Sequence, residues 1–277
     1  MAGPDPVAIS EGLRRLGFAL ERNPQRRHQA RAFLRAARNL ARVDAAELQH
    51  HLVGGTLTQL PGVGDSIAGV IRDLANGVEP SYWHSASLEQ APPPPDAAAA
   101  ELLRALRGDC HLHSNWSDGA TEIEEMALAA RELGHEYMVL TDHSPSLTIA
   151  HGLSPERLEQ QLYVIETLNR DLAPFRILTG IECDILADGS LDETDELLSR
   201  LDVVVASVHS LLRQPAEAMT PRLLAAVRNP HTDILGHCTG RIVTGRGRPQ
   251  SQFDAEAVFA ECARHSVAVE INSRPER

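Results

Sequence analysis

From residue 101 onward, the chain alternates short apolar runs with longer stretches in which apolar positions recur at helical spacing. The apolar runs have the length of strands and fall at 109–114, 137–143, 176–185, 202–210, 233–238 and 267–272. Helical patterns lie between them, at 121–133, 155–172, 191–200, 220–228 and 254–265. Strands joined by helical crossovers predict a parallel α/β sheet, either open or closed into a barrel.

The first 84 residues have a different pattern, which is helical throughout. Apolar positions over about 25–42 follow the 3.6-residue period of a helix. The segment "GTLTQLPGVGDSIAGVIRDLANG" (55–77) predicts a short helix, a glycine-containing turn and a second helix. Four prolines in "APPPPDAAAA" (91–100) predict a stiff linker. We therefore expect a helical domain over 1–84, a linker over 85–100 and an α/β domain over 101–277.

The charged residues are unevenly distributed. All 26 basic residues are arginines, and the net charge of the 277 residues is −12. Residues 1–42 carry nine arginines against three acidic residues, whereas residues 96–277 carry 16 against 29. A basic head on an acidic body suggests two separate tasks.

Neither the hydropathy nor the cysteine content points to a membrane or an oxidising compartment. No apolar run approaches the roughly 18 residues of a membrane helix, and Arg14 and Arg15 interrupt the first 20 residues, where a signal peptide would need an apolar core. Four cysteines in a chain of this length do not form a disulfide framework. The sequence predicts a cytoplasmic protein with reduced thiols and no membrane partner.

Five arginines recur at spacings of three and four along the helix predicted over 25–42, at Arg27, Arg31, Arg35, Arg38 and Arg42. Such a stripe can be an ordinary solvated helix face, or it can bind phosphates, because no acidic residue interrupts it. In the following turn, Gly62 and Gly64 permit close backbone approach, and the start of the next helix can hold a phosphate. Asp65 argues against phosphate binding at the start of this helix, because it puts a negative charge where the phosphate would lie.

Polar residues with metal-binding side chains recur at the carboxyl ends of five predicted strands, where parallel α/β folds build their sites. The candidate ligands are His111, His113, Asp118, His143, Glu182, His209 and His237. A single histidine at a strand end is usually structural, but five in the same relative position indicate one cause. Mixed histidine and carboxylate donors suit Zn²⁺, Mn²⁺ or Fe²⁺. Seven candidates exceed the needs of one tetrahedral ion, so we expect two or three ions.

The segments "HLHSNWSDG", "LTDHSPS", "GIECDI", "VVASVHS" and "ILGHCTGR" resemble the successive motifs of the PHP (polymerase and histidinol phosphatase) domain family. The resemblance implies a distorted seven-stranded barrel with a trinuclear metal centre that hydrolyses phosphoesters. It assigns all seven candidates as metal ligands and Glu182 as the bridging carboxylate. Arg241 lies where a basic residue would hold substrate phosphate. The seventh strand, with its Asp-x-His pair, is missing after "EINSRPER", so we expect either a C-terminally truncated domain or an incomplete third metal position, with an exposed edge.

The head, residues 9 to 84, is similar to the helical DNA-binding domain of family X DNA polymerases, including its helix-hairpin-helix motif. The nucleotidyl-transferase palm of those enzymes is absent, because only a short linker stands in its place. Lyase versions of this head use a lysine for Schiff-base chemistry, and the corresponding positions here are Ser66 and Val70. The resemblance therefore implies DNA binding by the head without polymerase or lyase activity.

Three functions follow as hypotheses. The leading one is a metal-dependent phosphoesterase that acts on DNA, in 3′-end processing or repair. The second is a phosphatase for a small phosphomonoester such as histidinol phosphate. The third is a non-catalytic DNA-binding module with a structural metal site. The oligomeric state does not follow from the sequence.

Overall fold

The computed structural model describes residues 4–21, 26–83, 95–119 and 121–274, in two compact units, Met1–Ala100 and Glu101–Arg277. Most of the predicted linker, residues 85–94, lies outside the described residues. The short helix α6 (Ala97–Ala105) spans the division between the units. Each unit has its own hydrophobic core, and each is described by itself.

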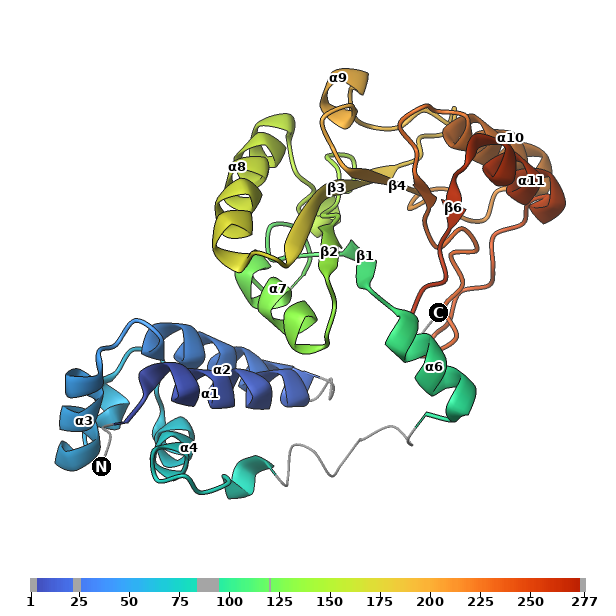
Figure 1. Ribbon diagram of the computed structural model, residues 1–277. Helices are drawn as coiled ribbons and strands as arrows, with labels where there is room; N and C mark the ends of the chain where they lie inside the picture. Colours follow the sequence, from blue (N-terminus) through green and yellow to red (C-terminus); the bar gives the residue numbers. More distant parts are fainter. Residues whose placement is uncertain (1–3, 22–25, 84–94, 120, 275–277) are drawn as a thin grey trace. The chain divides into compact units, whose positions relative to one another are not determined.

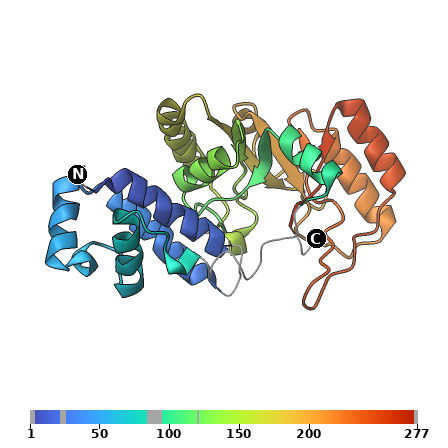
Figure 2. The same ribbon diagram turned by 60° about the horizontal axis from the view of Figure 1, so that its bottom comes forward.

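The first unit consists of helices. They are α1 (Pro6–Glu21), α2 (Arg27–Leu40), α3 (Ala45–Gly54), η2 (Leu57–Gln59) and α4 (Asp65–Ala75). Figures 1 and 2 both show α1 and α2 side by side. Their apolar faces bury Leu13, Leu16 and Phe33 in a common core. The Asp44 carboxylate caps α3 by accepting a hydrogen bond from Glu47 N at 2.8 Å. The unit is helical, as the sequence pattern predicts.

The second unit is an α/β domain that begins with α6. Its strands are β1 (Gly108–Leu112), β2 (Tyr137–Leu140), β3 (Arg176–Asp184), β4 (Val203–Ser207), β5 (Ile234–Leu235) and β6 (Ala268–Val269). Its further helices are α7 (Ile123–Glu132), η3 (Thr148–Ala150), α8 (Pro155–Leu172), α9 (Asp195–Leu198), α10 (Ala216–Val227) and α11 (Ala255–His265). All neighbouring strands pair in parallel, in the order β1-β2-β3-β4-β5-β6. The predicted parallel α/β sheet is confirmed.

The six strands form a curled sheet with helices packed around it (Figure 1). In that view, α7 and α8 lie beside the first strands, and α10 and α11 lie beside the last ones. Within the described residues, β1 and β6 are the edges of the sheet, and no seventh strand lies between them. Pairing continues one residue beyond the two short strands: Gly236 N donates to Ala206 O at 2.9 Å, and Glu270 N donates to Leu235 O at 3.0 Å.

One predicted helix is much shorter in the structure. The pattern predicts a helix over 191–200, but only Asp195–Leu198 is helical. Leu191 pairs instead with Ile185 in an antiparallel bridge. The Asp192 carboxylate accepts hydrogen bonds from Asp184 N at 2.8 Å and from Ser144 Oγ at 2.8 Å. These tertiary contacts hold residues 191–192 extended, against the local periodicity.

A buried arginine of α10 joins the segments that follow β3 and β4. The side chain of Arg222 is only 2% exposed. Its guanidinium donates to Leu186 O at 2.8 Å, to Ser210 O at 2.9 Å, and to Ile185 O. Leu186 O also accepts a hydrogen bond from Gly189 N at 2.9 Å. The guanidinium joins the segment after β3 to the segment after β4, so Arg222 fixes both segments.

We expect Arg222→Met to lower the free energy of unfolding of the metal-free protein by roughly 3 kcal/mol or more, because buried carbonyls lose charged donors. Urea denaturation measures this loss. Arg228→Met is the matched control, because the Arg228 side chain is 56% exposed and pairs only with Glu261 among its described ion pairs. Equal losses in the two variants would contradict the role assigned to Arg222.

Among the described residues, no helix is both long enough and apolar enough to cross a membrane.

Candidate metal centre

The ends of five neighbouring strands place six side chains in one cluster. β1 carries the first of them, His111, and β3 carries Glu182 in its interior. An isolated parallel bridge between His143 and Glu182 extends the pairing of β2 and β3 to the cluster. We call this group the histidine–glutamate cluster: His111, His113, His143, Glu182, His209 and His237.

Glu182 lies at the centre of this cluster, with its side chain fully buried. Its Oε1 atom faces three imidazoles: His237 Nε2 at 2.9 Å, and His111 Nε2 and His209 Nε2 at 3.3 Å each. Its Oε2 atom faces His143 Nδ1 at 2.9 Å and His113 Nε2 at 3.4 Å. One buried carboxylate thus contacts the donor atoms of five histidines.

Asp118 borders the same cluster from the loop after β1. Its Oδ1 atom lies 3.6 Å from His143 Nε2 and 3.7 Å from His113 Nδ1, and its side chain is half exposed. The structure therefore brings together all seven candidate ligands. Arg241 differs, because it is exposed on the loop after β5 and its backbone nitrogen donates to Thr239 Oγ1. Its part in substrate binding stays a prediction.

The close packing of carboxylates and imidazoles shifts their pKa values. Burial would lower the pKa of His111, but the carboxylates of Glu182 and Glu270 raise it to about 9. The pKa of His209 is likewise raised to about 9 against its burial, by Asp184 and Glu182. Burial lowers the pKa of His113 to about 4. Burial also opposes the ionised form of Glu182, but the imidazoles around it hold its pKa well below the usual range.

These shifts predict a pH optimum for the stability of the metal-free protein. His111 and His209 bind protons more tightly when folded, so their stabilisation is present below pH 6.5 and is lost as the pH rises through about 9. His113 has the opposite effect, because the unfolded chain takes up its proton between pH 6.5 and about 4. We expect the melting temperature in the presence of a chelator to be highest near pH 6.5. A melting temperature that keeps rising up to pH 9 would contradict this prediction.

The donor set of the cluster fits divalent metal ions. Four groups of three residues have ligand atoms within 4.8 Å of one another: His111/His237/Glu270, His111/His113/Glu182, His113/Asp118/His143 and His143/Glu182/His209. Both carboxylate oxygens of Glu182 are buried and lack a partner with hydrogen-bond geometry. Buried carboxylate oxygens that face several imidazoles without making hydrogen bonds are expected where ions are bound, because a buried carboxylate without hydrogen bonds is costly. Imidazole nitrogens with carboxylate oxygens suit zinc and manganese.

A family model described as PHP domain matches residues 109–274 of the chain. The chain belongs to the PHP domain family. The resemblance drawn from the five strand-end motifs is thereby confirmed, and the matched residues include the whole histidine–glutamate cluster.

Two curated relatives of this chain are named for different activities. The chain is 45% identical over 175 residues to the DNA polymerase/3′-5′ exonuclease PolX of Bacillus subtilis strain 168. The aligned residues cover 63% of this chain and 30% of that protein. It is 28% identical over 172 residues to a probable phosphatase of Caldicellulosiruptor saccharolyticus, and the aligned residues cover 61% of this chain and 66% of that protein. The chain thus matches less than two thirds of the length of either relative.

A solved structure is also similar. It is the histidinol phosphate phosphatase of Lactococcus lactis in complex with zinc, L-histidinol and phosphate. The sequence identity is 20%, the TM-score is 0.43, and the match covers 61% of this chain and 74% of that one.

A second carboxylate of the PHP domain, Asp142, holds the loop that carries Asp118. It precedes His143 in the chain but faces away from the cluster. Its oxygens accept hydrogen bonds from Ser114 N at 2.8 Å, Ser114 Oγ at 2.6 Å, Ser117 Oγ at 2.6 Å and Gln161 Nε2 at 2.7 Å. Adjacent residues of an extended strand end point to opposite sides, so one reaches the cluster and the other fixes the loop.

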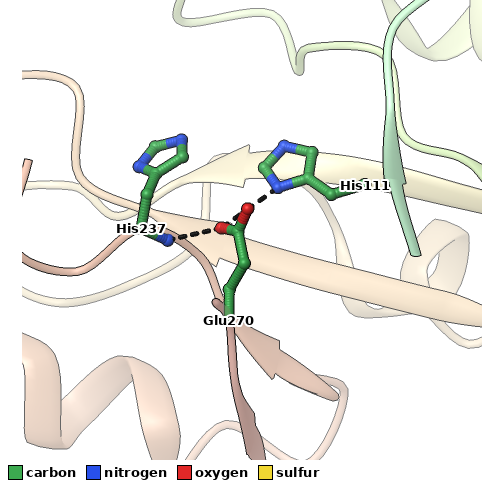
Figure 3. Close-up of side chains that lie close together, drawn as sticks. All are labelled: His111, His237 and Glu270. Carbon is green, nitrogen blue, oxygen red and sulfur yellow. Dashed lines mark hydrogen bonds and ion pairs between the residues drawn. The ribbon is translucent and has the colours of Figure 1, made fainter. Parts of the chain in front are cut away.

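Glu270 is the member of these groups that the sequence reasoning missed. It follows β6 directly, in the run "VAVEIN", and its carboxylate faces His111 and the backbone of His237 (Figure 3). The signal for it was the same as for the others, because Glu270 occupies the carboxyl end of the sixth predicted strand. No histidine stands beside it, so the histidine pattern did not include it.

Three of the four cysteines are buried and one is exposed. Cys183, Cys238 and Cys262 are buried, as expected of small apolar residues. Cys110, which lies on β1, is exposed. β1 is an edge strand, so the face opposite the cluster is not fully covered there.

In the helical unit, the structure places part of the arginine stripe beside the glycine turn. Gly62 has a φ of 79°, which favours glycine, and a Cβ there would lie 3.6 Å from Arg35 Nε. Asn39 Nδ2 donates to Pro61 O at 2.8 Å, which fixes the turn against α2. Gly64 is the N-cap of α4 and provides no side-chain cap, and Asp65 is the first residue of that helix.

The arginines of the stripe differ in exposure. Arg31, Arg35 and Arg42 are exposed and Arg38 is half buried, whereas the side chain of Arg27 lies outside the described residues. Three guanidinium groups on α2 and the turn that follows it therefore face solvent. Their role in DNA binding stays a prediction.

Proposed function

We propose that this PHP domain chain hydrolyses phosphoester bonds with two or three divalent ions, Zn²⁺, Mn²⁺ or Fe²⁺, bound in the histidine–glutamate cluster. The observation that carries the proposal is the fully buried carboxylate of Glu182 with five imidazoles within 3.4 Å. Divalent ions bound there would acidify a water molecule and neutralise phosphoryl oxygens.

The residues around the cluster have separate tasks in this proposal. Glu182 is central to the donor set and would hold the ions together with the histidines, because its two oxygens face different imidazoles. Asp118 completes the set on the solvent side, where its half-exposed carboxylate meets His113 and His143. Arg241 is exposed on the loop after β5 and binds substrate phosphate there. No side chain of the cluster is needed as a nucleophile.

DNA is the proposed substrate, in 3′-end processing or repair. Two observations support it: three exposed arginines lie on α2 and directly after it, and Arg35 lies beside the glycine turn. Arginines and free helix N-terminal amides bind phosphates without reading sequence. The curated name of the Bacillus subtilis relative, DNA polymerase/3′-5′ exonuclease PolX, agrees with a DNA substrate.

The proposal is tested by adding Mn²⁺ or Zn²⁺ to the metal-free full chain and following a 3′-labelled oligonucleotide and p-nitrophenyl phosphate. We expect metal-dependent hydrolysis of the oligonucleotide that His111→Ala plus His113→Ala abolishes. The variant His50→Ala plus His51→Ala, in α3, is the matched control. Hydrolysis that survives the loss of His111 and His113 would contradict the proposal.

A small phosphomonoester is the second candidate substrate. The acidic charge of the α/β unit favours it. Residues 96–277 contain 16 arginines and 29 acidic residues, and this net negative charge repels a polyanion more than it repels a single phosphate. The curated name of the Caldicellulosiruptor relative, probable phosphatase, agrees with it. Efficient turnover of free phosphomonoesters, with DNA a poor competitor, would favour this candidate over DNA.

A further inference from the structure

Glu270 is held in place by contacts with β1, with β5 and the segment that follows it, and with Asn272 of its own segment. Its backbone nitrogen donates to Leu235 O of β5 at 3.0 Å. Its Oε1 atom accepts a hydrogen bond from Asn272 Nδ2 at 2.7 Å, and its Oε2 atom accepts one from His237 N at 2.5 Å. The same Oε2 lies 3.2 Å from His111 Nδ1, and the side chain is only 11% exposed. Figure 3 shows the carboxylate between the two histidines.

The two ring nitrogens of His111 consequently face two different carboxylates. Nε2 faces Glu182 Oε1 at the centre of the cluster, at 3.3 Å, and Nδ1 faces Glu270. The contact at Nδ1 is an ion pair at 3.2 Å without hydrogen-bond geometry, so the carboxylate stabilises a proton on that nitrogen by charge attraction. The neutral ring then presents the lone pair of Nε2 to the centre, which is the form that binds a metal ion.

The same carboxylate fixes a second histidine through its backbone. Because Glu270 Oε2 accepts from His237 N, it sets the start of the segment that follows β5. The ring of that residue reaches Glu182 Oε1 with Nε2 at 2.9 Å. Glu270 therefore acts on two histidines from strands that are not neighbours in the sheet.

The contacts also decide between an orienting and a ligating carboxylate. Both oxygens of Glu270 already accept hydrogen bonds from amide groups of the chain. The Glu182 oxygens, in contrast, are buried without partners of hydrogen-bond geometry. A carboxylate whose oxygens already accept hydrogen bonds suits a residue that orients a metal ligand. A carboxylate whose oxygens accept none suits a metal ligand itself.

We propose that Glu270 is a positioning residue, which holds the Nδ1–H form and the ring orientation of His111 and the backbone of His237 for metal binding. This inference rests on the metal-binding part of the proposed function. It does not depend on which phosphoester is cleaved.

The test compares Glu270→Gln with Glu261→Gln in the full chain. Glutamine keeps the length of the side chain but offers an amide donor to His111 Nδ1, which favours the opposite tautomer. Glu261 is an equally suitable buried carboxylate, 4% exposed, that pairs with Arg228 and Arg264 of the same unit. Zinc affinity is measured by competition with a chromogenic chelator. We expect Glu270→Gln to lower it about 10- to 100-fold, and Glu261→Gln to leave it unchanged.

A second readout separates orientation from general destabilisation. Long-range ¹H–¹⁵N spectra of the zinc-loaded protein, with His111 assigned from His111→Asn, report which ring nitrogen carries the proton. We expect a protonated Nδ1 and a metal-bound Nε2 in the wild type. A metal-bound Nδ1 would make Glu270 a partner ligand and would overturn the proposal, as would equal zinc affinities in the two glutamine variants. A wild-type chain that binds none of Zn²⁺, Mn²⁺ and Fe²⁺ would overturn the proposed function as well.

Discussion

Replacing Glu182 by glutamine is expected to reduce metal-dependent hydrolysis more than about 100-fold, beyond the 10- to 100-fold typical of residues that only orient metal ligands. The side chain is fully buried, and its oxygens face five imidazoles. Glutamine has nearly the same shape but puts a neutral amide where two of the ligand groups share the Glu182 carboxylate. Without the negative charge, the centre loses both a bridging ligand and the main neutralising charge for bound cations.

The measurement combines the hydrolysis rate at saturating Mn²⁺ with the number of ions bound per chain. Glu261→Gln is again the matched control, because it removes a buried carboxylate of the same unit without touching the cluster. The melting temperature of each metal-free variant shows whether the fold is retained. Hydrolysis within tenfold of the wild type in Glu182→Gln would place the reaction away from this centre.

The second large effect is expected in the helical unit. We expect the triple variant Arg31→Gln, Arg35→Gln and Arg42→Gln to bind duplex DNA on the order of 100-fold more weakly at 0.1 M salt. The three guanidinium groups are exposed, and Arg35 lies beside the glycine turn. If each contacts one phosphate, the slope of log affinity against log salt decreases by about three. Fluorescence anisotropy across a salt series measures both quantities.

The control variant removes three exposed arginines of the α/β unit: Arg131→Gln, Arg170→Gln and Arg176→Gln. It has the same net charge as the triple variant of α2, so it isolates position from overall charge. We expect p-nitrophenyl phosphate turnover to be unchanged in both variants. Equal losses of DNA affinity in the two variants, or an unchanged salt slope, would contradict DNA binding by α2.

Much of the α/β fold and the cluster could be predicted from the sequence, because both have short-range signals. The apolar runs mark buried parallel strands, and a histidine or glutamate at each carboxyl end marks the shared rim of the sheet. Alternation along a strand also explains why His143 joins the cluster while Asp142 binds the neighbouring loop. What the sequence predicted well was therefore the set of residues that share one periodicity.

The remainder depends on contacts between distant segments, which periodicity does not contain. The predicted helix over 191–200 is mostly replaced by extended chain because Asp192 binds backbone and hydroxyl groups near residues 144–146 and 184. Cys110 is exposed because it lies on an edge strand, and strand order in the sheet is a tertiary property. Glu270 becomes important only when β6 brings it to His111, 159 positions away in the numbering.

That separation has a consequence for how the protein is made. Folding rates fall as the contacts that define a structure span longer stretches of chain, and the contacts of this centre run from His111 on β1 to Glu270 after β6. During synthesis, a chain that still lacks residue 270 has His111 without the carboxylate that faces its Nδ1 atom. We therefore expect ion affinity to rise only after β6 has docked against β5, so that ion content would report the docking of β6.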